Sequence, residues 1–179
     1  VIRIDGQDIT KIRQDSLRRH IGVVQQDSSL LHRSVRDNIL YGRPEASEAE
    51  MIAAAKQAQA HEFILDLTDP EGRSGYDALV GERGVKLSGG QRQRIAIARS
   101  LVTRPELIVA DEPVSALDVS VQAQVLNLMQ DLRAEYGMAY LFISHDLAVV
   151  EYLCEDIVVL FRGTIVESGK TRDVMRNPM

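Results

Sequence analysis

The stretch LIVADEP, Leu107–Pro113, decides the fold class of this chain. It opens with a continuous apolar run, which is typical of a strand buried on both faces of a parallel sheet. Asp111 and Glu112 follow at the carboxyl end, where open α/β proteins bind their ligands. Asp111 there suits a Mg²⁺ shell, through water, and Glu112 is placed to orient or deprotonate an attacking water. A pair of acids that merely ends a strand would give the same pattern.

The sequence after this stretch alternates helix and strand. Residues 119–136 predict an amphipathic helix that Gly137 ends. Residues 138–144 predict a second buried strand, and His145 follows it, so His145 should reach the same edge of the sheet. A helix and a hairpin turning at Arg162-Gly163 come next. This alternation of helices and strands predicts an α/β fold around a mostly parallel sheet. For His145 a structural role stays open as well, because an isolated histidine is more often structural than catalytic.

The sequence before this stretch is mostly helical. A strand at residues 21–24 precedes a short helix with Ser34 as its N-cap and a longer helix, residues 47–67, opened by a Ser47–Glu50 capping box. A turn-rich loop then leads to another helix that ends near residue 102. The pattern predicts a core part made of residues 1–26 and 105–179, with a helical subdomain inserted at residues 27–104.

A pair of glycines opens the last of these helices, in the run Ser88-Gly89-Gly90-Gln91. Ser88 is a good N-cap, and the two glycines let backbone N–H groups approach an anion at the positive end of the helix. The run therefore predicts a phosphate-binding segment. The arginines that follow, Arg92, Arg94 and Arg99, are expected to be solvated or close to that phosphate.

The bulk composition excludes several classes of function. A net charge of −5 and an aromatic content of 4% argue against a nucleic-acid surface, so no nucleic-acid partner is expected. A single cysteine cannot form an internal disulfide, which fits a reducing, cytoplasmic compartment. No window approaches the roughly 20 apolar residues of a membrane-spanning helix. Any contact with a membrane is expected to come through a partner or through sequence beyond these residues.

Five motifs in order resemble the nucleotide-binding domain of ATP-binding cassette (ABC) transporters. They are VVQQD (23–27), LSGGQ (87–91), LIVADEP (107–113), SALD (115–118) and SHD (144–146). The resemblance implies a P-loop NTPase-type fold that binds ATP and Mg²⁺. It also implies two kinds of partner, a second nucleotide-binding domain and transmembrane domains, and a location at the inner face of the cell membrane.

The resemblance also implies a role for each matching residue. Asp111 belongs to the Walker B strand, with Glu112 as the general base and His145 as the switch histidine. Gln26 matches a glutamine that contacts both Mg²⁺ and the transmembrane partner, and Asp118 matches a loop that contacts the opposite subunit. The segment from Ser88 through Gly89 and Gly90 to Gln91 matches the signature that binds the nucleotide held by that subunit.

The chain departs from the family in two ways. The P-loop is missing, because the string Gly169-Lys170-Thr171 has no glycine five residues earlier and follows a hairpin. The resemblance is therefore to a cassette that lacks its N-terminal segment, including the P-loop strand and helix, and the isolated chain is expected not to hydrolyse ATP. The first half, with Gly81–Gly84 (GERG), is exporter-like, whereas the second half is similar to the ATPase subunits of oligopeptide importers.

Three functions remain open from the sequence. The leading one is an ATPase domain in which a dimer of cassettes couples ATP hydrolysis to transport across a membrane. The second is a soluble ABC ATPase without a transport role. The third is a non-catalytic remnant or a hybrid fragment, with the junction near Arg99.

Overall fold

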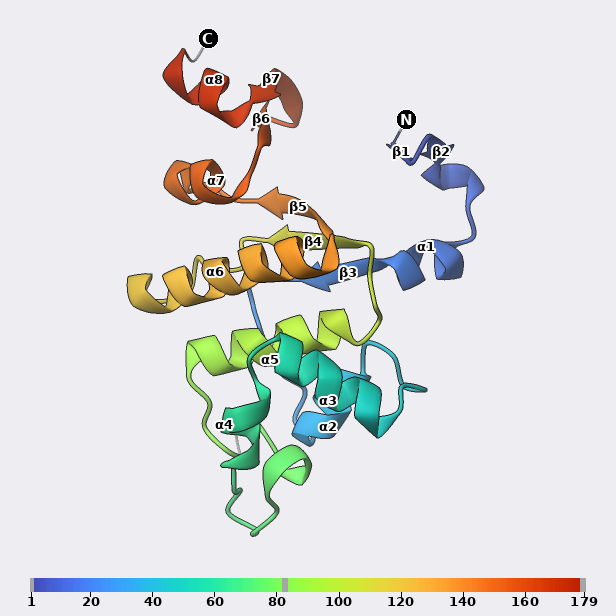
Figure 1. The fold of residues 1–179 in the computed structure, drawn as a ribbon, viewed down its shortest axis with the longest axis vertical. Coiled ribbons are helices and arrows are strands. Elements are labelled where there is room, and N and C mark those ends of the chain that lie inside the picture. The colour runs from blue at the N-terminus through green and yellow to red at the C-terminus, as the bar shows by residue number, and fades with distance from the viewer. Residues whose placement is uncertain (1, 82–83, 178–179) are drawn as a thin grey trace. The chain divides into compact units, whose positions relative to one another are not determined.

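The computed structural model describes residues 2–81 and 84–177 (Figure 1), and these fall into two units that divide between Leu141 and Phe142. The first unit begins with a small antiparallel hairpin of β1 (Arg3–Ile4) and β2 (Gln7–Asp8). Its turn uses positive φ angles at Asp5 (48°) and Gly6 (76°). The 3₁₀ turn η1 (Ile9–Lys11) and the helix α1 (Gln14–His20) then lead into the sheet.

The central sheet has the strand order β3-β4-β5, with β3 at Ile21–Val24, β4 at Leu107–Asp111 and β5 at Ala139–Ile143. Strands β3 and β4 are parallel, and Val24 lies opposite Ala110. The sequence prediction of an α/β fold with a parallel sheet is confirmed.

One face of this sheet is buried and the other is not. On the buried face, Val24 and Ile108 are each 1% exposed. On the opposite face of β3, Val23 is 52% exposed, and Leu141 of β5 is 55% exposed. The prediction of a buried strand at residues 138–144 is therefore wrong for β5, and β4, predicted to be buried on both faces, is only half-buried on one of them. A continuous apolar run indicates that both faces of a strand can be buried. Whether both are buried depends on which other elements pack against the sheet.

Four helices and a 3₁₀ turn lie between β3 and β4 in the described part of the chain. They are α2 (Val35–Leu40), α3 (Glu48–Gln57), α4 (His61–Leu65), η2 (Gly75–Asp77) and α5 (Gly89–Leu101). Helix α5 contacts α2, α3 and β3, and its apolar face is fully buried at Ile95 and Ile97. The predicted N-cap of Ser34 and the Ser47–Glu50 capping box are confirmed.

The helix predicted for residues 47–67 is in fact two helices, α3 and α4. Gln59 adopts a left-handed φ of 51° between them. The amide of Ala60 donates to the carbonyl of Ala55 (2.8 Å), and that of Gln59 donates to Lys56 (2.9 Å). These two bonds make a Schellman motif, which ends a helix. The sequence contains no signal for this end, because glycine usually occupies the left-handed position.

The second of the two units contains α7 (Leu147–Leu153), β6 (Asp156–Phe161), β7 (Thr164–Lys170) and α8 (Thr171–Arg176). Strands β6 and β7 pair antiparallel, and their turn has positive φ at Arg162 (50°) and Gly163 (77°). The predicted hairpin and its turn residues are confirmed.

The longest described helix is α6 (Val119–Tyr136), which Gly137 ends with a φ of 66° as predicted. None of the helices within residues 2–81 and 84–177 has the length and apolar character needed to cross a bilayer.

Candidate functional site

Gln26 and the acidic pair lie at one edge of the sheet. Because β3 and β4 are parallel with Val24 opposite Ala110, the residues that follow both strands emerge at the same edge. Asp111 is the last residue of β4 and is exposed, and Gln26, two residues beyond β3, is exposed as well. The register of β3 and β4 thus places at one edge of the sheet an amide and a carboxylate that the sequence separates by 85 positions.

The backbone of Glu112 is held in an unusual conformation. Its φ is 46°, in the left-handed region that non-glycine residues rarely adopt. Its carbonyl oxygen accepts hydrogen bonds from both the amide (3.3 Å) and the hydroxyl (3.1 Å) of Ser115. Strained backbone that the surroundings enforce is a feature of functional sites.

The glycine pair opens α5 under a complete capping box. The Ser88 hydroxyl accepts from the Gln91 amide (3.2 Å), and the Gln91 side-chain oxygen accepts from the Ser88 amide (2.9 Å). Within the described part of the chain, the amides of Gly89 and Gly90 have no acceptor, as expected for the first turn of a helix. Two backbone donors at the positive end of a helix suit an anionic oxygen.

Each arginine of α5 donates to a protein acceptor, and the expectation that these residues are solvated or close to a phosphate is wrong for Arg99, whereas Arg92 is exposed. Arg92 donates to the Leu87 carbonyl (2.7 Å). Arg94 donates to the side chain of Gln124 (3.0 Å). Arg99 is half-buried at the far end of α5, where burial lowers the pKa of its guanidinium.

Asp118 lies at the start of α6, close in sequence to the Glu112 turn. It is exposed, and its carbonyl accepts from the amides of Val121 (2.9 Å) and Gln122 (2.8 Å). Gln122 also donates from its side chain to the Val114 carbonyl (2.9 Å). Hydrogen bonds within the segment between β4 and α6 therefore hold it in consecutive turns.

His145 belongs to the second of the two units, so its distance from Gln26 and Asp111 stays a prediction. It follows β5 and is exposed. The neighbouring Asp146 caps α7 through its carboxylate, which accepts from Ala148 (2.9 Å), and its amide donates to the Ser144 hydroxyl (3.0 Å). These bonds fix the backbone on the C-terminal side of His145.

The Gly169-Lys170-Thr171 string lies at the junction of β7 and α8, with no loop between them. Lys170 donates to Asp156 on the neighbouring strand, with an Nζ–Oδ2 distance of 3.0 Å. This arrangement leaves no loop of backbone amides around the lysine and agrees with the exclusion of a P-loop at this position.

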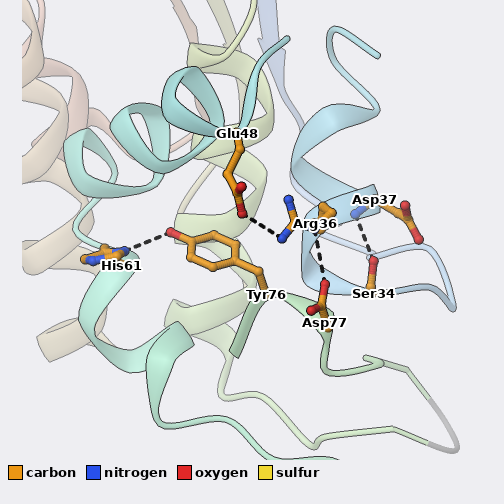
Figure 2. A network of polar contacts seen from close by, with 7 residues as sticks. All are labelled: Ser34, Arg36, Asp37, Glu48, His61, Tyr76 and Asp77. Atoms are coloured by element: carbon orange, nitrogen blue, oxygen red, sulfur yellow. Dashed lines mark hydrogen bonds and ion pairs between the residues drawn. The ribbon is translucent and has the colours of Figure 1, made fainter. Parts of the chain in front are cut away.

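A polar network that the sequence does not indicate joins the helices between β3 and β4 (Figure 2). Arg36 on α2 binds Glu48 on α3 (2.9 Å) and Asp77 on η2 (3.1 Å). The ring of His61 meets the Tyr76 hydroxyl at 2.9 Å, and burial raises the pKa of Tyr76 to about 12.

Asp69 organises the loop before α5, and it too carries no signal in the sequence. Its carboxylate accepts from the Leu79 amide (2.9 Å) and from Arg73 Nε (2.7 Å). These bonds, the backbone bond from Leu79 foremost, lower its pKa to about 2. The exporter-like GERG segment follows this loop, and its Glu82 and Arg83 lie outside the described residues.

The side-chain oxygens at the sheet edge suit Mg²⁺ better than a metal ion whose ligands all come from the protein. In residues 2–81 and 84–177, no cluster of three or more histidine, cysteine or acidic side chains could hold a metal ion. Mg²⁺ needs less, because it keeps several waters and takes one or two protein oxygens together with substrate phosphates. Asp111 and Gln26 offer two such oxygens.

Comparison with known proteins gives one consistent family. The family model described as ABC transporter matches residues 1–115. An uncharacterized ABC transporter ATP-binding protein of Haemophilus influenzae is 48% identical over 97% of this chain and 28% of its own length. The cyclolysin secretion/processing ATP-binding protein CyaB of Bordetella pertussis is 48% identical over 94% of this chain and 22% of its own length.

A solved structure agrees with these relatives. A bacterial Atm1-family ABC exporter with ATP bound matches with a TM-score of 0.80 and 43% identity, over 97% of this chain and 29% of that chain. The fold is therefore the α/β fold of an ABC ATPase. The chain belongs to the ABC transporter family. It spans about a quarter of the length of the two curated relatives.

Proposed function

We propose that this chain is part of the ATP-binding domain of an ABC exporter, in which a dimer of cassettes couples ATP hydrolysis to transport. The observation that carries the proposal is the parallel register of β3 and β4, which places Gln26 and Asp111 at the same edge of the sheet. The exporter relatives support the direction of transport, because their matches extend through both halves of the chain. A hybrid with an importer subunit stays the alternative for the second half.

ATP would contact this chain at the signature segment. The amides of Gly89 and Gly90 would donate to phosphate oxygens of a nucleotide held by the opposite cassette. The capping box commits the side chains of Ser88 and Gln91 to holding these amides in place. Asp118, exposed at the start of α6, would face the same partner.

The chain's own catalytic groups lie at the sheet edge. Asp111 and Gln26 would bind Mg²⁺, which supplies charge neutralisation at the phosphates when it is bound. Glu112 would accept a proton from the attacking water or orient it, and His145 would donate to the transferred phosphate. The lysine and the backbone loop of a P-loop would have to come from polypeptide outside these residues.

The division into core and helical parts follows from this proposal. Residues 1–26 and 105–179 would form the catalytic core, and residues 27–104 the helical subdomain that contacts transmembrane partners. The chain would thus lie at the cytoplasmic face of the membrane, held there by those partners.

The proposal is tested by association with an intact cassette. The chain is mixed with the ATP-binding domain of the Haemophilus influenzae relative, and complex formation is measured by light scattering with ATP or ADP and Mg²⁺. We expect a complex that requires ATP and that the Ser88→Arg substitution abolishes.

Ser47→Arg is the matched control. Ser47 and Ser88 are both N-caps in complete capping boxes, so the two substitutions damage a helix start in the same way. ATP-dependent association should survive Ser47→Arg. Association that is the same with ATP and with ADP, or that both substitutions reduce equally, would overturn the proposal.

A further inference from the structure

The signature glycines are packed against the start of α6 in the same chain. A Cβ atom built on Gly90 would lie 2.6 Å from Cγ1 of Val121, and one built on Gly89 would lie 2.9 Å from Cδ2 of Leu117. Gly90 is itself buried. Such distances are shorter than van der Waals contact, so the two glycines leave space for side chains as well as for an anion.

The neighbour of Gly90 has little freedom to move. Val121 is β-branched, which leaves one strongly preferred side-chain rotamer in a helix. Its amide donates to the Asp118 carbonyl (2.9 Å), so its backbone is fixed in the first turn of α6. Leu117 is held less directly, through an amide bond to Val114 (3.1 Å), and its side chain is unbranched at Cβ and can turn aside.

We propose that Val121 is a positioning residue that locks two dimer-facing segments of one chain together. Its side chain fills the space above Gly90 and so fixes the signature segment, residues 87–91, relative to the SALD segment, residues 115–118. Figure 1 shows the two helices concerned, α5 and α6, which are in contact. The inference rests on the proposed function for the importance of these segments, but the contact itself needs no nucleotide.

The lock has a consequence for motion. A displacement of Asp118 by an approaching subunit would carry Gly89 and Gly90 with it, because Val121 and Gly90 cannot slide past each other. The anion donors and the partner-contacting loop would then move as one body.

The test uses the sign of a stability change in the 179-residue chain. Gly→Ala within a helix ordinarily raises stability. Because of Val121, Gly90→Ala is expected to lower the urea midpoint of unfolding. In a Val121→Ala background the same substitution should raise the midpoint.

Val119→Ala is the matched control, because Val119 lies two positions earlier on the same helix and is 81% exposed. In that background Gly90→Ala should still lower the midpoint. If Gly90→Ala alone does not fold, the comparison of Val121→Ala with the double variant decides. A Gly90→Ala substitution that raises the midpoint with Val121 present, or lowers it equally in every background, overturns the proposal.

A second readout separates positioning from mere stability. In the ¹⁵N-labelled chain, Gly90→Ala should shift the amide resonances of Asp118 and Val121. Adding Val121→Ala to the Gly90→Ala variant should return the Asp118 resonance to its position in the Val121→Ala variant. Unchanged resonances at Asp118 would overturn the lock even if stability fell. Both readouts are taken without ATP, so they can succeed or fail independently of the association experiment.

Discussion

The guanidinium of Arg99 holds both oxygens of Asn38, with Nη2–Oδ1 at 2.8 Å and Nε to the backbone oxygen at 2.9 Å. Asn38 is fully buried, and its side chain also accepts from the Leu31 amide (2.8 Å) and donates to the Leu31 carbonyl (3.0 Å). The end of α5 thereby fixes α2 and the segment that follows Gln26.

Replacing Asn38 by alanine should lower the free energy of unfolding by about 3 kcal/mol, because buried partners lose their bonds and one of them is charged. Urea unfolding measures the loss. Lys56→Ala on the exposed surface of α3 is the control, with an expected change within about 0.5 kcal/mol. Equal effects of the two substitutions would show that the Arg99–Asn38 contact does not stabilise the fold.

Acid should weaken the loop that Asp69 organises. Its pKa in the folded protein falls from the ordinary 3.8 to about 2. A group whose pKa is lowered by folding contributes stability above its unfolded pKa and loses it as the pH falls through its folded pKa. The urea midpoint should therefore drop between about pH 4 and about pH 2.

Asp69→Asn should reduce that drop and lower the midpoint at neutral pH. Part of the acid dependence should remain, because hydrogen bonds from Ser47 lower the pKa of Glu50 to about 2 as well. A profile for Asp69→Asn that matches the unmodified chain would contradict the assignment.

The left-handed backbone at Glu112 predicts that a glycine variant at this position is more stable than an alanine variant, the reverse of the order expected at most positions. Glycine adopts a φ of 46° without strain, whereas alanine carries the strain that every residue with a Cβ has there. Glu112→Gly should therefore be more stable than Glu112→Ala by about 1 kcal/mol. Thermal unfolding of both variants measures the difference, and at an extended position such as Val109 glycine should be the less stable of the two.

Much of the fold could be predicted because the signals are local. The turn at Arg162-Gly163, the caps at Ser34 and Ser47, and the strand at residues 107–111 all depend on neighbouring residues. The end of α3 could not be predicted, because Gln59 takes the place of the usual glycine.

The long-range contacts of the site could not be predicted at all. Nothing in the sequence near Arg99 indicates that it binds Asn38, 61 positions away. Anion binding alone accounts for the glycines at 89 and 90 in the sequence, whereas their contact with Val121 and Leu117 depends on how α5 and α6 pack. The exposed face of the sheet could not be predicted for the same reason.

ATP turnover of the purified chain, alone and mixed with the intact ATP-binding domain of the Haemophilus influenzae relative, tests the proposed function most directly. We predict no turnover by the chain alone, and in the mixture a rate above that of the relative alone, which Ser88→Arg removes and Ser47→Arg does not. Turnover by the isolated chain that Glu112→Gln abolishes would contradict this prediction, because these residues would then form a complete site without a P-loop.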